Sequence, residues 1–387
     1  MDVKIKIPSS KSLVNRYLIL KEGFSNLSLD WDSEAEDVLH LKKALEVYKS
    51  TREIYIGEGG TTLRFLAVYL SSQKGSWVLE GAVALFKRPQ DELVKTLKAL
   101  GAKAVIKENK LFIESVGWQV KEIEVDALKT TQVLTGLILA ALASGQELRI
   151  KLGRVGMNSD YLQLTKRFIE SLGFRLEFKE SEILIFKDQV LEENITFTRL
   201  ESDWSSAAFI YVLAAVLGRA EILGLMEESF QPDSEVLRIL KSAGVSVLGH
   251  AVEKPVYKGF KYKPIDVNLQ KCPDLFPVLS VFSCFCDGES VLYGAPQLVY
   301  KESNRIKLIS NLLTKCGYKV SAREDGLKIQ GENFKVLEHE EFSFDASSDH
   351  RIFMACEIFK KAGYRINIKG AESIKKSFPE YLKMDVS

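Results

Sequence analysis

Residues 8–16 read PSSKSLVNR and join a short strand to a helix. Polar and apolar side chains alternate over residues 2–7, which predicts a strand, and an apolar pattern of helical period runs from Leu13 to Leu20. Serine is a good helix N-cap, and the free N–H groups of a helix start attract anions. Lys11 and Arg16 follow within about a turn and a half, so the stretch predicts a seat for phosphate or carboxylate. A capped helix with solvated cations would carry the same residues, and only a repeat of the arrangement favours the anion seat.

The composition is that of an ordinary globular protein with balanced charge. The 387 residues include 53 basic and 52 acidic side chains, a net charge of +1, and 46 % are hydrophobic. General nucleic-acid binders usually show a basic excess, so we expect no nucleic-acid partner. We find no signal segment and no apolar run of membrane-spanning length, and therefore expect no membrane partner and a cytoplasmic location.

The chain has an odd number of cysteines, all in its second half: Cys272, Cys284, Cys286, Cys316 and Cys356. Cys284 and Cys286 lie within an apolar run, and no histidine spacing completes a zinc site around them. We therefore expect reduced, buried thiols and no metal.

Four segments share one pattern: an amphipathic helix, a glycine, a strand, a polar turn and a second strand. They cover residues 93–115, 164–186, 236–254 and 308–331. Their glycines Gly101, Gly173, Gly244 and Gly317 are separated by 72, 71 and 73 positions (173−101, 244−173 and 317−244). Glycine after the last helical turn is a common left-handed cap, and a steady period over four copies indicates an internal repeat.

A second type of helix begins with small or polar residues and is apolar on most sides. Its six starts lie at residues 9–12, 59–62, 129–132, 203–206, 272–274 and 347–351. Helices that are apolar nearly all round belong in a core, so each repeat would combine one buried helix, one amphipathic helix and a small sheet. The sequence predicts an α/β (α+β) fold of six βαβαββ-like units, three in each of two domains.

Equivalent buried helices should lie parallel within a domain, which gathers their positive N-termini on one face. Each such end stabilises an exposed anion by roughly 0.3–1 kcal/mol. Capping explains serine, threonine and aspartate at these starts. It does not explain the cations at or near the junctions, which are Lys11, Arg88, Lys301, Arg305, Arg351 and Lys376. We therefore expect multiply anionic substrates.

Eight motifs, in order along essentially the whole chain, resemble those of the enolpyruvyl transferase family. They are SSKSLVNR (9–16), GEGGTTLRFL (57–66), KRPQDELVKTL (87–97), TTQ (130–132), DWSSAAFIYVLAA (203–215), KESNRI (301–306), SSDHRIFMA (347–355) and SIKKSFPEYL (373–382). One such match means little, but eight in order are highly specific. The resemblance implies a two-domain inside-out α/β barrel, with the helix N-termini facing the cleft between two three-unit domains.

The resemblance also implies a reaction between two small molecules. The enolpyruvyl group of phosphoenolpyruvate is transferred to the 5-hydroxyl of shikimate 3-phosphate, and phosphate is released. The implied course is addition and then elimination through a tetrahedral intermediate, with no metal or organic cofactor.

Matched motif by motif, the resemblance implies three catalytic residues, Lys11, Asp274 as base and Glu302 as proton donor. The residues implied to bind shikimate 3-phosphate are Lys11, Ser12, Arg16, Thr130, Thr131, Gln132, Asn158, Tyr161, Asp274, Gln297 and Lys301. Those implied to bind phosphoenolpyruvate are Lys11, Gly60, Arg88, Gln132, Arg305, Arg351 and Lys376. Asp274 could instead simply cap its helix, and Glu302 could be an ordinary ion-pair partner.

Some positions depart from the family pattern, namely Glu58, Phe65, Asn158 and Asn304. Glu58 stands where a small or amide residue is usual, and a carboxylate there would repel phosphoenolpyruvate unless it points away or pairs. Three alternatives therefore stay open. One is a non-catalytic anion-binding relative. Another is transfer of the enolpyruvyl group to UDP-N-acetylglucosamine. The enzyme that performs this transfer uses a cysteine in the first half of its chain, whereas the first cysteine of this chain is Cys272. The third is RNA-end cyclisation, against which the near-zero net charge weighs.

The two domains are expected at residues 12–200 and at residues 1–11 with 201–387. The chain would cross between them near Ser10 and near Leu200. We expect the protein to be a monomer.

Overall fold

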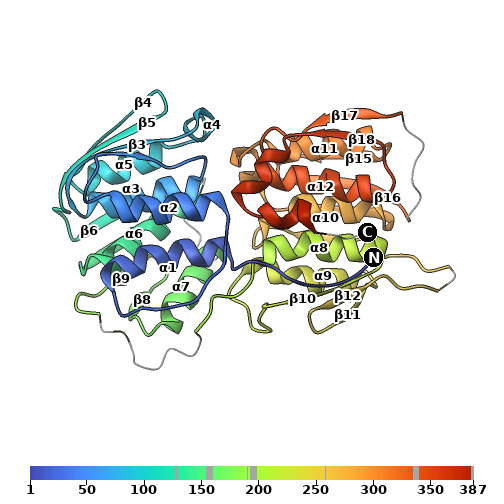
Figure 1. The fold of residues 1–387 in the computed structure, drawn as a ribbon, viewed down its shortest axis with the longest axis horizontal. Coiled ribbons are helices and arrows are strands. Elements are labelled where there is room, and N and C mark those ends of the chain that lie inside the picture. Colours follow the sequence, from blue (N-terminus) through green and yellow to red (C-terminus); the bar gives the residue numbers. More distant parts are fainter. Residues whose placement is uncertain are drawn as a thin grey trace. The chain divides into compact units, whose positions relative to one another are not determined.

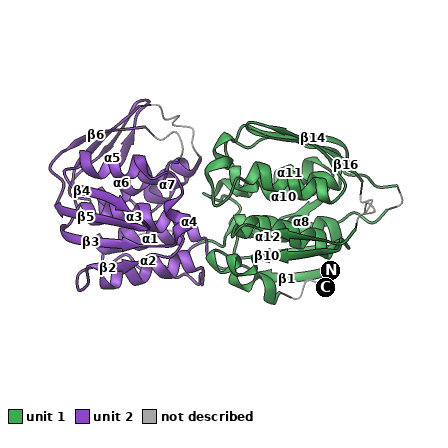
Figure 2. Cartoon of the chain, turned by 90° about the horizontal axis from the view of Figure 1, so that it is seen from above, with its two compact units in different colours: residues 1–8, 201–387 green, residues 9–200 purple. Residues whose placement is uncertain are grey.

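The computed structural model describes residues 1–126, 130–153, 160–189, 191, 198–257, 259–333 and 340–384. The candidate residue Asn158 lies outside these ranges. Contacts divide the chain into two compact units, unit 1 with Met1–Pro8 and Glu201–Ser387, and unit 2 with Ser9–Leu200 (Figure 2). Across the described ranges, the helices are too short or too polar to cross a membrane.

Unit 2 combines buried helices with outer helices and short strands. Its buried helices are α1 (Lys11–Gly23), α3 (Gly60–Ser71) and α6 (Gln132–Ala143). Its outer helices are α2 (Glu36–Val47), α4 (Val83–Phe86), α5 (Asp91–Ala99) and α7 (Asp160–Ser171). Its strands are β2 (Glu53–Tyr55), β3 (Lys74–Glu80), β4 (Lys103–Lys107), β5 (Lys110–Val116), β6 (Glu122–Val125), β7 (Leu148–Leu152), β8 (Leu176–Phe178) and β9 (Glu182–Ile185).

Unit 1 is built in the same way. Its buried helices are α8 (Trp204–Leu217), α10 (Phe276–Cys284) and α12 (His350–Lys361), and its outer helices are α9 (Glu235–Ser242) and α11 (Arg305–Lys315). Short 3₁₀ helices are η1 (Pro232–Ser234), η2 (Pro273–Leu275), η3 (Pro296–Tyr300), η4 (Ala371–Lys376) and η5 (Pro379–Lys383). Its strands are β1 (Asp2–Lys6), β10 (Arg219–Leu223), β11 (Ser246–Leu248), β12 (Ala251–Glu253), β13 (Asp266–Asn268), β14 (Asp287–Tyr293), β15 (Lys319–Arg323), β16 (Gly326–Glu332), β17 (Phe342–Asp345) and β18 (Ile366–Lys369).

The strand order repeats. Four sheets run β2-β3-β5-β4, β6-β7-β9-β8, β1-β10-β12-β11 and β13-β14-β16-β15. In each, the first pair is parallel and the other two pairs are antiparallel. Parallel neighbours need a crossover connection, which α3, α6 and α10 supply in three of these sheets. The sheet topology thus confirms the internal repeat.

Two of the six predicted repeats, those around α12 and α1, are smaller than the sequence predicts. β17 and β18 form a two-stranded parallel sheet with α12 between them, and the described chain continues through η4 and η5 without a further hairpin. Around α1 the described residues show only the bridge between Asp30 and Arg199. At this place the chain enters and leaves unit 2. Two segments distant in sequence therefore meet where the other repeats have a sheet built from consecutive strands.

The buried helices form the core of each unit. α8, α10 and α12 pack against one another (Figure 1), and on α8 every residue from Ser206 to Val216 is buried. The five cysteines are free and buried, as the sequence predicts. The four repeat glycines have φ of +96° (Gly101), +83° (Gly173), +101° (Gly244) and +91° (Gly317), which confirms them as left-handed helix caps.

Gly244 and Gly249 form a matched pair for testing this cap. Gly244 has φ of +101° and Gly249 has φ of +55°, close to the left-handed region that other residues also visit. An added Cβ would lie 3.7 Å from Phe260 at Gly244 and would meet no described atom within 4 Å at Gly249. We expect Gly244→Ala to lower the free energy of unfolding in urea by about 1–2 kcal/mol, and Gly249→Ala by less. Equal losses would contradict the role of Gly244 as an obligatory cap.

Candidate functional site

In unit 2, α1 and α3 begin without a side-chain cap. Ser10 stands at the N-cap of α1, but its hydroxyl is buried and makes no hydrogen bond within the described residues. The expected serine cap is therefore wrong. Gly59 stands at the N-cap of α3 and has no side chain to offer. The first N–H groups of both helices thus lack a capping acceptor, as an anion seat requires.

Arg16, in the second turn of α1, is a buried cation without a carboxylate partner among the described residues. It is 4 % exposed and donates to Thr165 Oγ1 (3.0 Å), Ser12 O (2.7 Å) and Tyr161 O (3.3 Å). Burial lowers the pKa of Arg16 to about 9, against a smaller opposing effect of Tyr161. Its guanidinium also lies 5.7 Å from the centre of the Phe65 ring. Because a buried charge is costly unless it is paired, this part of unit 2 is suited to an incoming anion.

Two arginines converge on Gly60, the first residue of α3. A Cβ built on Gly60 would lie 2.7 Å from Arg64 Nη1 and 2.8 Å from Arg88 Nη1. Arg64 is buried and donates to Gln132 Oε1 (2.5 Å), which joins the starts of α3 and α6. Gln132 Nε2 in turn donates to Thr61 Oγ1 (2.8 Å). A side chain at residue 60 would displace one or both guanidinium groups, which lie against the Gly60 backbone.

Three other candidates of unit 2, Lys11, Thr130 and Thr131, lie at the starts of α1 and α6. Lys11 Nζ is 2.8 Å from Asp37 Oδ2. The Thr130 hydroxyl accepts a hydrogen bond from Gln132 N (3.2 Å), and Thr131 is the N-cap of α6. Tyr161 is half-buried on α7.

In unit 1 two buried helices begin with an acidic cap. Asp203 accepts from Ser206 N (2.8 Å) at α8, and Asp349 accepts from Arg351 N (3.1 Å) at α12. An aspartate cap offsets the positive end of a helix. The aspartate caps therefore offset the positive ends of α8 and α12, and cationic side chains must attract any anion there.

Arg305 is the centre of an ion-pair network in unit 1. Its side chain is 2 % exposed. It donates to both carboxylate oxygens of Asp349 (2.9 and 3.2 Å), to Asp274 Oδ1 (2.9 Å) and to Glu302 Oε2 (2.8 Å). Burial by itself would lower the pKa of Arg305, but Asp349, Glu302 and Asp274 outweigh it and raise the pKa. The network fixes both predicted catalytic carboxylates on one cation.

Asp274 lies among three cations. Lys301 Nζ (3.1 Å) and Arg305 Nη1 (2.9 Å) contact its Oδ1, and Arg351 Nη2 (3.1 Å) contacts its Oδ2. Arg351 also donates to the backbone carbonyl of Asp274 (3.2 Å). The structure thus brings the predicted residues of η2, α11 and α12 together. We call Asp274, Lys301, Glu302, Arg305, Asp349 and Arg351 the ion-pair cluster.

Two further candidates of unit 1 lie on 3₁₀ helices. Lys376 on η4 is buried, and its Nζ donates to Ser348 O (2.7 Å), just before α12. Gln297 is half-buried on η3, which leads to Lys301.

Three further residues, Arg64, Asp349 and Asp233, are not among the site residues predicted from the sequence. Arg64 follows Gly60 by one helical turn and Asp349 immediately precedes α12, so both had a local signal. Asp233, on η1, is 1 % exposed and accepts a hydrogen bond from the Ser205 hydroxyl. Burial, and then the charge of Asp274, raise the pKa of Asp233 to about 6. No local pattern marks Asp233, because its neighbours come from separate segments. Within the described residues, no group of three or more His, Cys, Asp or Glu could hold a metal ion.

Comparisons with known proteins agree on one family. The sequence model described as EPSP synthase (3-phosphoshikimate 1-carboxyvinyltransferase) matches residues 21–384. The chain belongs to the EPSP synthase family. It is 31 % identical over 336 residues to the 3-phosphoshikimate 1-carboxyvinyltransferase of Pyrococcus furiosus, covering 85 % of this chain and 79 % of that protein. It is 27 % identical to the protein of the same name from Clostridium beijerinckii, covering 98 % and 93 %.

Solved structures lead to the same family. An EPSP synthase from Acinetobacter baumannii superimposes with a TM-score of 0.71 at 25 % identity, over 99 % of this chain and 94 % of that chain. The enolpyruvyl transferase NikO from Streptomyces tendae, at 12 % identity and a TM-score of 0.66, shares the fold. The predicted α/β fold and the resemblance to enolpyruvyl transferases are confirmed.

Arg16→Met tests the buried cation. It removes a charge that no described carboxylate compensates, so we expect the free energy of unfolding of the ligand-free protein to rise by about 1 kcal/mol. Shikimate 3-phosphate should stabilise the wild type against urea but no longer stabilise this variant. Arg199→Met is the control, because Arg199 is exposed and pairs with Asp32. An Arg16→Met variant that still responds to the ligand would contradict the anion seat.

Asp233→Asn tests the buried carboxyl through pH. The pKa of Asp233 is raised from 3.8 to about 6, so the folded state keeps a proton that the unfolded state loses. Native stability therefore falls as the pH rises from about 4 to about 6. Relative to the wild type, the variant should gain up to about 3 kcal/mol across this range in urea unfolding and match it below about pH 4. A difference independent of pH would show that the carboxyl is ionised throughout.

Proposed function

We propose that this member of the EPSP synthase family transfers the enolpyruvyl group of phosphoenolpyruvate to the 5-hydroxyl of shikimate 3-phosphate and releases phosphate. The step belongs to aromatic amino acid biosynthesis. The observation that carries the proposal is Arg16, buried without a carboxylate partner among the described residues. Such a cation favours a doubly charged ligand group such as a phosphate.

Shikimate 3-phosphate binds chiefly through the helix starts of unit 2. Arg16 and the uncapped N-terminus of α1 receive its phosphate, with Lys11 and Ser12 beside them. Thr130, Thr131 and Tyr161 supply hydroxyl groups for the phosphate and the ring. Lys301, Gln297 and Asp274 of unit 1 bind its remaining hydroxyls, and Asn158, outside the described residues, completes the proposed set. The support is chemical: hydroxyl and cationic donors match a phosphorylated polyol.

Phosphoenolpyruvate binds through arginine and lysine. The Gly60 backbone with Arg88 and Gln132 takes one of its anionic groups, since Gly60 faces two guanidinium groups. Arg351 and Lys376 take the other. Arg305 contributes charge, and in the ligand-free protein it also holds Asp274 and Glu302 in place. Guanidinium suits this substrate because its fork binds carboxylate and phosphate bidentately.

The two carboxylates of the ion-pair cluster perform the proton transfers. Asp274 accepts the proton of the 5-hydroxyl as that oxygen attacks C2 of phosphoenolpyruvate, and Glu302 gives a proton to the methylene carbon. In the elimination, a methyl proton returns to Glu302 and the phosphate leaves. Glu302 contacts Arg305 in the ligand-free protein, so its acid role requires that the bound anions raise its proton affinity.

The cysteine positions and the two carboxylates favour this function over the alternative functions. Transfer to UDP-N-acetylglucosamine is not favoured, since no cysteine precedes Cys272. A relative that only binds anions would have no use for two carboxylates, Asp274 and Glu302, that are both hydrogen-bonded to Arg305. We also infer a cytoplasmic monomer of two domains, at residues 12–200 and at 1–11 with 201–387. Five free, buried cysteines are compatible with a reducing compartment.

Turnover tests the proposal directly. Purified protein with both substrates should release phosphate in a coupled assay, and Asp274→Asn and Glu302→Gln should each lower kcat by about 10²–10³. Asp266→Asn and Glu289→Gln, at exposed carboxylates of the same unit, should leave kcat within about twofold. No phosphate release by the wild type with both substrates would overturn the function. Full activity of either cluster variant would overturn the assigned roles.

A further inference from the structure

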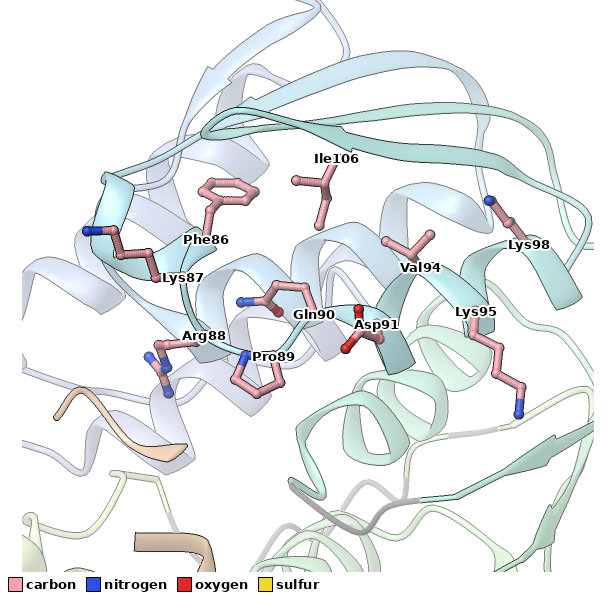
Figure 3. Close-up of a pocket in the computed structure, with 10 residues that line it drawn as sticks. All are labelled: Phe86, Lys87, Arg88, Pro89, Gln90, Asp91, Val94, Lys95, Lys98 and Ile106. Carbon is pink, nitrogen blue, oxygen red and sulfur yellow. The ribbon is translucent and has the colours of Figure 1, made fainter. Parts of the chain in front are cut away.

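Unit 2 has a pocket beside the segment that carries Arg88 (Figure 3). Its volume is about 760 Å³, within the usual size of small-molecule sites. The turn from α4 to α5, α5 itself and β4 form its walls. Arg88 also lines the pocket, and Figure 3 shows its side chain extending away from Phe86 and Ile106.

One wall of the pocket is apolar. Phe86, Val94 and Ile106 line it, and all three side chains are half-buried. These residues belong to α4, α5 and β4, and their side chains point into the same hollow (Figure 3). A flat aromatic or branched group fits between them, whereas a bare inorganic ion would leave this surface uncovered.

The rim of the pocket is basic. Lys87, Lys95 and Lys98 are exposed, and none of them forms an ion pair with a carboxylate among the described residues. The rim thus has three lysines against one lining carboxylate, Asp91. On a chain whose net charge is +1, this local excess favours an anionic ligand.

Gln90 adds a polar group within the wall. It is 5 % exposed, and its Nε2 donates to Leu85 O (2.9 Å), which fixes the orientation of the amide. Its Oε1 is buried and has no donor among the described residues. A buried acceptor without a donor is unfavourable, so a small shift of this side chain toward a ligand N–H or O–H would be favourable. Arg88 Nε is also buried without a partner in the same part of the chain.

We propose that this pocket binds a small amphipathic carboxylate, with an aromatic or branched body and one hydroxyl or amino donor, and that its occupancy controls Arg88. The carboxylate meets Lys95 and Lys98, the apolar body covers Phe86, Val94 and Ile106, and the donor reaches Gln90. Phe86 precedes Arg88 in the sequence and Gln90 follows it. A ligand that contacts both residues therefore restricts the backbone motion of the turn that carries Arg88, whose guanidinium reaches Gly60. The binding stands on the pocket alone, whereas the control of Arg88 rests on the proposed function.

Calorimetry with 3-phenyllactate tests the binding, because this probe has a carboxylate, a phenyl ring and one hydroxyl. We expect saturable binding by the wild type below about 10 mM. 3-Phenylpropanoate, which lacks the hydroxyl, should bind about fivefold more weakly, and this preference should vanish in Gln90→Leu. The double variant Lys95→Glu with Lys98→Glu should weaken binding at least about tenfold. Lys43→Glu with Lys74→Glu, at two exposed lysines of unit 2 outside the pocket, should not change it.

Activity tests the control of Arg88. Saturating 3-phenyllactate should change the KM for phosphoenolpyruvate by at least about threefold in the wild type, and not in the Lys95, Lys98 double variant. No saturable heat with the wild type, or equal binding by the double variant, would overturn the pocket. Binding without a change in KM would overturn its coupling to Arg88. Absence of all turnover beside normal calorimetric binding would instead count against the proposed function.

Discussion

One topological constraint places the chemistry: a parallel pair of strands needs a crossover, and here the crossover is a buried helix. Because the same connection recurs, the buried helices of a unit pack side by side, and contacts between their first turns bring their N-termini to one end. Gln132 at the start of α6 touches Arg64 and Thr61 of α3, and Arg351 at the start of α12 touches Asp274 before α10. Residues far apart in sequence therefore meet at helix starts.

The two units use this arrangement in opposite electrostatic ways. In unit 2 the starts of α1 and α3 lack side-chain caps, and Arg16 and Arg88 have no carboxylate partner among the described residues. In unit 1, Asp203 and Asp349 cap their helices, and Arg305 is surrounded by three carboxylates. Unit 2 is therefore suited to binding anions, whereas unit 1 holds several carboxylates in a defined geometry. Burial, and then the charge of Asp274, raise the pKa of Asp233 in unit 1, against the opposing charge of Arg351.

Much of the fold was readable because the repeat is local. The glycines at 101, 173, 244 and 317 are caps with positive φ, and the six helix starts were found from small residues followed by apolar runs. The reduced sheets around α1 and α12 were missed, because strand pairing between distant segments such as Asp30 and Arg199 leaves no periodic pattern. The failure of Ser10 to cap α1 was missed for a similar reason: propensity gives the residue type, whereas the packing around it decides where its hydroxyl points.

The sequence by itself determined the repeat, the identity of the buried helices and the residue types gathered at their starts, because these depend on periodicity and on short motifs. Only the tertiary structure decided which charges are neutralised. In the sequence, all of the cations of the predicted site stand at or near helix starts and nothing distinguishes them. In the structure, Lys301, Arg305 and Arg351 contact Asp274. Arg16 and Arg88 contact no described carboxylate. Charge pairing depends on distances of a few ångströms between separate segments, and no local pattern encodes these distances.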